Sequence, residues 1–237
     1  MTQKLPGEPL LSDYMFTLSG PHRQILEFYE RNHNAPRFGY IDETFSAPTK
    51  DINGYGIHQG HYAIAMTIIE NQDVRSLRDS LTDISGNYYH ANESAQQRNI
   101  DMLNTTGRYT NMDTNIIAVH TSIPYGASEE ETQHIMRSAR NESLTALLKL
   151  ATDREDPVKA FVIERTMRET ENQKDRQTIQ RLTRNNIIPP VNYVQVSSTA
   201  ERNLWAADAV AYSMAQALLR SDLTLQEKSG IQLSIYD

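Results

Sequence analysis

Cysteine is absent from the 237 residues of this chain. Without cysteine the protein has no disulfide scaffold, no thiolate nucleophile and no cysteine-ligated zinc site. The GxSxG, GxGxxG and GxxxxGK[ST] sequences are absent as well. These absences argue against serine hydrolases with a nucleophile elbow, Rossmann dehydrogenases and P-loop nucleotide hydrolases.

Long apolar runs are also missing from the sequence. The longest, residues 62–69, is far shorter than the roughly 20 residues of a bilayer-spanning helix. The first residues, MTQKLPGEPLL, lack the charged start and apolar run of a signal peptide. We therefore expect a soluble, cytoplasmic protein with no membrane partner.

The charge balance restricts the partners of the protein. With 23 basic and 30 acidic residues, the net charge is −7, which excludes a simple basic nucleic-acid binder. A nucleic acid would have to be met by a local basic face or through metal ions. Hydrophobic residues make up 38% of the chain, enough for a folded core and clear of the composition of disordered chains.

The hydrophobic patterns predict a mixed α/β domain. Residues 37–45 alternate as a strand does, so Asp42 and Glu43 point to opposite faces. The Gly-rich segment 51–56 predicts a turn into the following antiparallel strand. Strands are expected at residues 37–45, 61–69, 87–90, 115–122, 158–164 and 191–196, and helices at 21–32, 73–84, 92–103, 128–156 and 171–185 and after residue 198.

Three sequence signals predict helix starts. Ser128 with Glu131, and Ser198 with Glu201, have the spacing of capping boxes. Asn92 is the expected cap of the helix at 92–103.

Asp208 lies on the apolar stripe of the last predicted helix. Burying this carboxylate costs several kcal/mol (~2–7) unless it is paired. Asp42 shares its strand face with apolar residues, so the two carboxylates could meet around a divalent cation, for which Mg²⁺ or Mn²⁺ suits oxygen ligands. The alternatives are that Asp208 accepts hydrogen bonds from a loop or pairs with an arginine, and that Asp42 caps a turn.

Two further acids are candidate site residues. Glu164 ends the strand at 158–164, and Glu93 stands in the first turn of the helix at 92–103. The alternative for Glu164 is an exposed position at the start of a loop. The alternative for Glu93 is a favourable interaction with the helix dipole, without further function.

Residues 159–186 carry a net charge of +3, with seven basic and four acidic residues. This segment is the best candidate for contacting phosphates. The alternative is a solvated helix face with ion pairs one turn apart. The candidate nucleic-acid-binding residues are Arg165, Arg168, Lys174, Arg176, Arg181 and Arg184.

Five segments in order, FGYIDET, GHYAIAMTII, YYHANESAQQR, AFVIER and VQVSSTAERNLWAADAVAYS, resemble the bacterial family called domain of unknown function 3800. The resemblance covers residues 37–219 and implies a ribonuclease H-like fold: three antiparallel strands followed by parallel additions, flanked by helices. It also implies an N-terminal helical extension at 1–36, the domain at 37–220 and a tail at 221–237.

The resemblance further implies a site and a function. Asp42 matches the first-strand aspartate of the superfamily and Asp208 the last-helix aspartate, and Glu164 and Glu93 match acidic positions between them. These residues would bind two divalent metals in a nuclease or phosphodiesterase. The strand ending VHTSIP departs from the pattern, with His120 and no acid.

Two alternatives to catalysis remain. The first is a non-catalytic scaffold or binding subunit on the same fold, because a fold does not guarantee its chemistry. The second is an accessory role beside a partner protein in a phage-defence or mobile-element system, which the family resemblance suggests. Homo-oligomerisation is left open.

Overall fold

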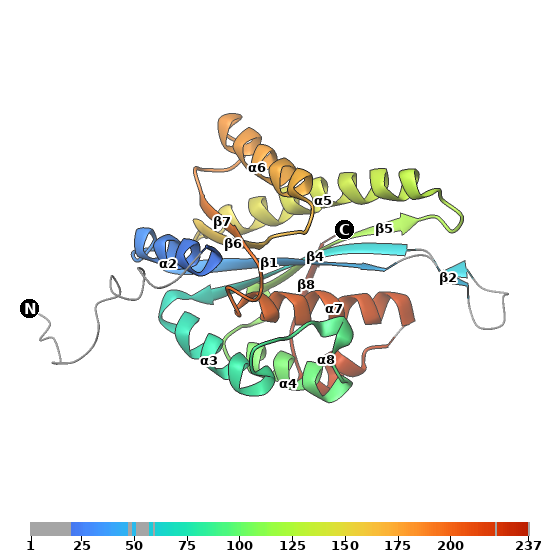
Figure 1. Cartoon of the computed structure of the whole chain (residues 1–237), viewed down its shortest axis with the longest axis horizontal. Helices are drawn as coiled ribbons and strands as arrows, with labels where there is room; N and C mark the ends of the chain where they lie inside the picture. The colour runs from blue at the N-terminus through green and yellow to red at the C-terminus, as the bar shows by residue number, and fades with distance from the viewer. Residues whose placement is uncertain (1–19, 47–48, 51–56, 59, 221, 237) are drawn as a thin grey trace, which may run out of the picture.

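The computed structural model describes residues 20–46, 49–50, 57–58, 60–220 and 222–236. It confirms the predicted α/β class, with a six-stranded mixed sheet between two layers of helices (Figure 1). The Gly-rich turn predicted at 51–56 lies outside the described residues. Among the described helices, none combines the length and the apolarity needed to cross a membrane.

The main sheet has the strand order β7-β6-β1-β4-β5-β8. β4 pairs antiparallel with both β1 and β5. β6 adds parallel to β1, β7 adds parallel to β6, and β8 adds parallel to β5. The strands are β1 (Arg37–Ser46), β4 (Gly60–Glu70), β5 (Asn115–Ile123), β6 (Ala160–Glu164), β7 (Asn192–Val196) and β8 (Ser234–Tyr236), with a separate pair of β2 (Thr49–Lys50) and β3 (Ile57–His58).

Two layers of helices cover the sheet (Figure 1). α5 (Glu129–Thr152) and α6 (Glu169–Arg184) lie on one side. The other side carries α3 (Val74–Ser85), α4 (Gln96–Gly107), α7 (Leu204–Arg220) and α8 (Thr224–Ser229). α2 (Pro21–Arg31) packs beside β7, and short 3-10 turns form η1 (Asn71–Asp73), η2 (Ala91–Glu93) and η3 (Met112–Thr114).

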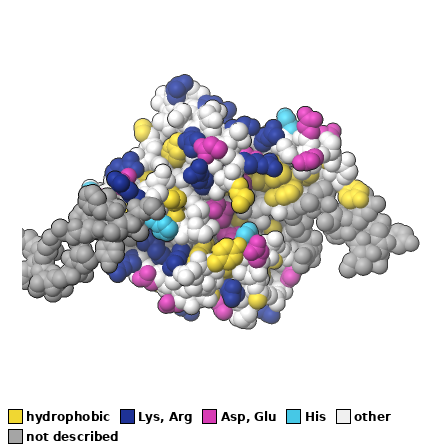
Figure 2. All heavy atoms as spheres, in the orientation of Figure 1, with side chains coloured by type: hydrophobic (Ala, Val, Ile, Leu, Met, Phe, Trp, Pro, Cys, Tyr) yellow, Lys and Arg dark blue, Asp and Glu magenta, His cyan; other side chains and the backbone are white. Residues whose placement is uncertain are grey.

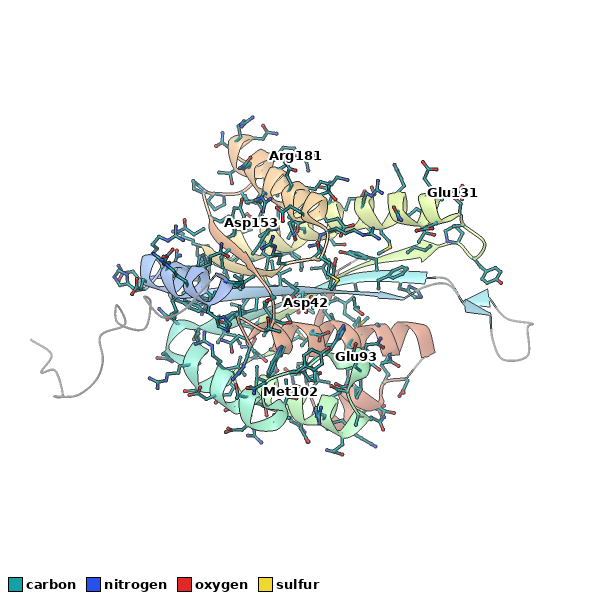
Figure 3. The ribbon with its side chains drawn as sticks, viewed as in Figure 1. Asp42, Glu93, Met102, Glu131, Asp153 and Arg181 are labelled. Carbon is teal, nitrogen blue, oxygen red and sulfur yellow. The ribbon has the colours of Figure 1, made fainter. Side chains whose placement is uncertain are left out.

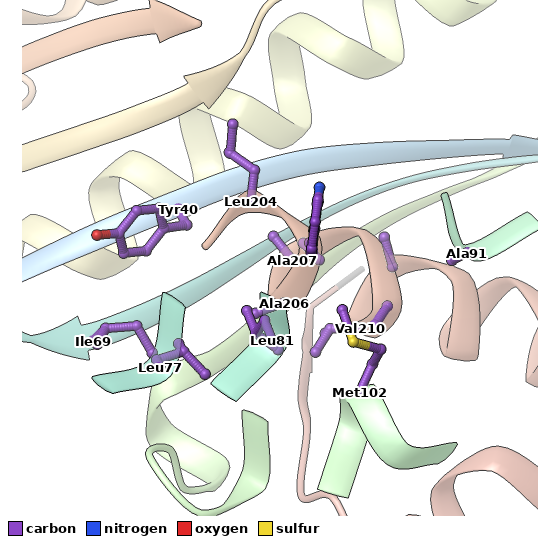
Figure 4. Packing of buried hydrophobic residues seen from close by; sticks show 14 of the residues in the cluster. Tyr40, Ile69, Leu77, Leu81, Ala91, Met102, Leu204, Ala206, Ala207 and Val210 are labelled. Carbon is purple, nitrogen blue, oxygen red and sulfur yellow. The ribbon is translucent and has the colours of Figure 1, made fainter. Parts of the chain in front are cut away.

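Each face of the sheet has its own hydrophobic core. β4 is buried at nearly every position because helices cover both of its faces, as in the central strands of layered α/β folds. On the α7 side, small residues such as Ala206, Ala207 and Ala211 let the helix backbone approach β1 and β4 closely (Figure 4). This close approach positions the polar residues of α7 against the sheet.

The segment between α3 and α4 differs from the expectation. Residues 87–90 form no strand, and α4 begins at Gln96 without a side-chain cap, so Asn92 is not its N-cap. The Tyr89 hydroxyl donates to Asn99, and the Asn99 amide donates to the Ala91 carbonyl, both inside the core. These buried hydrogen bonds hold the segment in an irregular path, which local propensity does not reveal.

One of the two predicted capping boxes is present. Ser128 and Glu131 cap α5 reciprocally, and this helix ends at Thr152, four residues before the predicted limit at 156. The box of Ser198 and Glu201 is wrong, because α7 begins only at Leu204. Both side chains instead form hydrogen bonds or ion pairs with residues far away in the sequence.

Both predicted terminal segments contribute to the packed structure. α2, in the predicted extension, buries Ile25 and Phe28 in the core on the α7 side. β8, in the predicted tail, pairs with β5 at the edge of the sheet.

Candidate functional site

Three carboxylates converge on the α7 side of the sheet. β1 and β6 pair in parallel with Tyr40 opposite Val162 and Ile41 opposite Ile163, so Asp42 and Glu164 follow at the same level. Side chains alternate along a strand, and Asp42 and Glu164 therefore share the face of Tyr40 and Val162, which lie in the core under α7. Figure 3 shows Asp42 in the sheet layer between the two layers of helices.

Asp208 meets this face from α7. The residue is only 8% exposed. Its Oδ2 atom accepts a hydrogen bond of 2.9 Å from the Ala91 backbone N–H and lies 3.5 Å from Nδ1 of His90. The loop hydrogen bond matches one alternative given for Asp208. It ties the η2 turn to α7 and fixes the direction of the carboxylate.

The surroundings of Asp42 disfavour its charged form. Its Oδ1 atom accepts a hydrogen bond of 2.7 Å from the Glu43 backbone N–H. Burial, together with the negative charges of Asp208 and Glu164, raises the pKa of Asp42 well above its usual range. The three carboxylates are therefore close enough to interact electrostatically.

Glu164 has one oxygen with a partner and one without. Oε1 accepts a hydrogen bond of 3.4 Å from the Ser198 hydroxyl. Oε2 is buried and has no hydrogen-bond partner among the described residues. Burial raises the pKa of Glu164 to about 7. A buried acceptor without a donor is unusual and calls for an explanation.

Compensating charge is scarce around these three acids. Among the described residues, no arginine or lysine forms an ion pair with Asp42, Glu164 or Asp208, and the nearby His90 is half-exposed. Carboxylate oxygens are the ligands that Mg²⁺ and Mn²⁺ prefer, so the donor chemistry fits a divalent cation. In the described part of the chain, however, no three His, Asp or Glu side chains already stand close enough together to enclose a metal ion.

Glu93 lies in the η2 turn, whose Ala91 backbone N–H binds Asp208. It is exposed in η2, where its carboxylate accepts a hydrogen bond of 2.9 Å from the Tyr88 hydroxyl. Within the described residues, no hydrogen bond or ion pair joins Glu93 to the other three acids. Figure 3 labels Glu93 in the layer of helices that contains α7.

The predicted basic residues belong to the opposite side of the sheet. α6 packs on the α5 face, and Figure 3 shows Arg181 there. Arg165 and Arg176 both pair with Glu169, and Arg168 pairs with Glu171 at 3.5 Å. For these three arginines the solvated-face alternative describes the contacts well. Figure 2 shows Lys and Arg side chains over the part of the surface formed by α6.

A second charged cluster was missed by the sequence analysis. Arg140 on α5 donates from Nε and Nη2 to Asp175 on α6, at 2.9 and 2.7 Å, and from Nη1 to Glu43. The Tyr62 hydroxyl also donates to Glu43. A signal was available: Asp175 shares a helical stripe with the buried residues Ile179 and Leu182, the pattern that marked Asp208.

Glu201 was also misassigned, and its role is structural. The side chain is 1% exposed and pairs with Arg78 at 2.6 Å, while the Tyr29 hydroxyl donates to it at 2.9 Å. Arg78 lies on α3, so this pair connects the start of α7 to the neighbouring helix.

The chain matched no protein-family model, and no curated protein matched it.

Proposed function

We propose that the protein is a divalent-metal-dependent phosphodiesterase, most simply a nuclease, with Asp42, Glu164 and Asp208 as its metal-binding residues. The observation that carries the proposal is the convergence of three partly or fully buried carboxylates from β1, β6 and α7 with no arginine or lysine paired to them among the described residues. Keeping such carboxylates ionised together near neutral pH requires positive charge from outside the chain.

The topology supports a ribonuclease H-like assignment within the α/β class. β5, β4 and β1 form three consecutive antiparallel neighbours, and β6 and β7 extend the sheet in parallel beyond β1. This order agrees with the one that the family resemblance implies. The candidate acids also come from the first strand, a later strand and the last long helix, as the resemblance implies.

Protein groups around the site orient the three carboxylates and leave oxygen atoms available for a cation. A bound Mg²⁺ or Mn²⁺ would supply an activated water and stabilise the leaving oxygen. Asp42 and Asp208 are oriented by backbone N–H groups of Glu43 and Ala91, so each keeps oxygen lone pairs for a cation. Glu164 offers the unpartnered Oε2, and Ser198 holds its other oxygen.

A nuclease assay tests the proposal. Labelled single-stranded and double-stranded DNA and RNA are incubated with the protein in Mg²⁺, in Mn²⁺ and in EDTA. We expect cation-dependent cleavage by the wild type and its loss in Asp208→Asn, which keeps an acceptor for the Ala91 N–H. Asp79→Asn is the matched control, because that carboxylate is 68% exposed on α3.

The outcome that contradicts the proposal is cleavage that survives in Asp208→Asn or in EDTA. Absence of cleavage on all four substrates, together with absence of cation binding, favours the second candidate, a non-catalytic scaffold on the same fold. One observation supports that candidate: no set of three potential ligands is already gathered within the described residues.

A further inference from the structure

A cavity of about 310 Å³ lies between α5 and α6, on the side of the sheet opposite the three carboxylates. Its floor includes Glu43 of β1 and Tyr62 of β4, and its walls come from the two helices. This volume is at the lower end of the roughly 300–1,000 Å³ of small-molecule sites. The cavity has no part in the proposed hydrolysis.

The floor of the cavity carries hydrogen-bond acceptors. Arg140 is shared between Glu43 and Asp175, so one positive charge balances two carboxylates. Glu43 keeps 29% of its side chain exposed. Such carboxylates accept hydrogen bonds from ligand hydroxyl or amino groups, whereas they repel an anion.

The mouth of the cavity carries positive charge. Arg137 donates to the amide of Gln133, and Arg181 donates to the amide of Asn141, so both guanidinium groups have neutral partners. Lys174 forms no ion pair within the described part of the chain. Three cations at the mouth are therefore not neutralised by carboxylates, in a protein whose net charge is −7.

We propose that this cavity binds a small phosphorylated molecule that also carries hydroxyl or amino groups, such as a sugar phosphate or a mononucleotide. Its phosphate lies at the mouth, where Arg137, Lys174 and Arg181 provide charge-assisted hydrogen bonds. Its hydroxyl or amino groups donate to Glu43 on the floor, the more exposed of the two acids that Arg140 pairs with. The limited volume and the acidic floor favour one small molecule over an extended nucleic-acid strand.

Isothermal titration calorimetry tests the proposal with four probes: ribose 5-phosphate, AMP, ribose and inorganic phosphate. We expect the wild type to bind ribose 5-phosphate or AMP more tightly than ribose or phosphate alone. The double variant Lys174→Gln/Arg181→Gln weakens that binding about tenfold, since it removes two charge-assisted contacts.

A matched control removes the same charge from the same two helices. Lys149→Gln/Arg184→Gln changes exposed cations of α5 and α6 that do not line the cavity, and it leaves the affinity within twofold. Thermal melting verifies that both double variants remain folded.

Three results overturn the proposal. The first is no binding of ribose 5-phosphate or AMP by the wild type, and the second is equal weakening in the control. The third is binding of a single-stranded oligonucleotide that depends on Lys174 and Arg181 while both monomers fail, which assigns the surface to a nucleic-acid strand. Because none of these readouts involves cleavage, the result is independent of the nuclease assay.

Discussion

Asp42 and Glu43 are neighbours on one strand, yet their side chains meet opposite electrostatic surroundings. Glu43 faces the α5 and α6 side, where Arg140 and the Tyr62 hydroxyl contact it. Asp42 faces the α7 side, where burial and then the negative charges of Asp208 and Glu164 raise its pKa. Because side chains alternate along a β-strand, a carboxylate paired with an arginine and a carboxylate without such a partner occupy adjacent positions.

The two clusters teach different lessons about buried charge. On the α5 side, Arg140 bridges two acids, and this pairing stabilises the packing of α5 on α6. On the α7 side, three acids raise the free energy of the folded chain and have no arginine or lysine partner among the described residues. Sites that do chemistry are where a protein retains such unfavourable groups, which is why the proposed function is placed on the α7 side.

The largest expected effect is a loss of stability on the α5 side, where Arg140 pairs with two acids. Arg140→Met leaves Glu43 and Asp175 without their cation in a buried setting, and should lower the free energy of unfolding by about 3–5 kcal/mol. Urea titration followed by fluorescence of Trp205, which is 1% exposed and the only tryptophan, measures the change.

Arg137→Met is the matched control for this prediction. It removes an exposed arginine from the same helix and should change the free energy of unfolding by less than about 0.5 kcal/mol. Equal effects of the two substitutions would show that the Arg140 cluster contributes nothing specific.

The next largest effect is expected on the α7 side, where replacing Glu164 should raise the free energy of unfolding. The pKa of Glu164 rises from 4.5 to about 7 on folding, so the folded chain binds more protons than the unfolded chain between these values. Stability from this group is complete below pH 4.5 and is lost as the pH rises through 7. In EDTA, Glu164→Gln should therefore stabilise the protein by up to about 3 kcal/mol at pH 8 and have little effect at pH 4.

Urea titration of wild type and Glu164→Gln at both pH values measures this difference. Glu171→Gln, which changes a half-buried glutamate paired with Arg168 on the other face, should not stabilise the protein at pH 8. A Glu164→Gln protein that is less stable than wild type at pH 8 would contradict the assignment of Glu164 as uncompensated.

The smallest effects compare one serine from each side. Ser128→Ala removes the capping box of α5 and should cost about 1 kcal/mol. Ser198→Ala removes only a long hydrogen bond to Glu164, and should cost less than about 0.5 kcal/mol. Denaturation midpoints of the two variants, measured together, test the assignment; a larger loss for Ser198→Ala would restore the capping interpretation.

Local patterns were sufficient for most of the fold. The alternation in β1 and the β-branched run of β5 predict strands, because side-chain periodicity reflects burial directly. The Ser128 cap was predicted because both partners lie within one turn. The Ser198 box failed because Glu201 pairs with Arg78, on a helix more than one hundred residues earlier, and this buried ion pair overrides the local motif.

The candidate site was predictable only in part. Asp208 was found because a charge on an apolar helix stripe is visible in the sequence, and Asp42 because strand alternation gives its face. The partners of Glu43 were not predictable, since Arg140 follows it by 97 residues and only the packed helices bring the two together. The exposed position of Glu93 also depends on the irregular path before α4.

Direct measurement of Mn²⁺ binding tests the central claim, that the α7 side holds a cation which its acids require. Calorimetric titration at pH 8 should give saturable binding to the wild type and to the control Asp79→Asn. Asp42→Asn and Asp208→Asn, checked for folding by thermal melting, should each weaken it at least about tenfold, because each removes a charged ligand. Absence of binding to the wild type, or equal affinity in all four proteins, would contradict the claim.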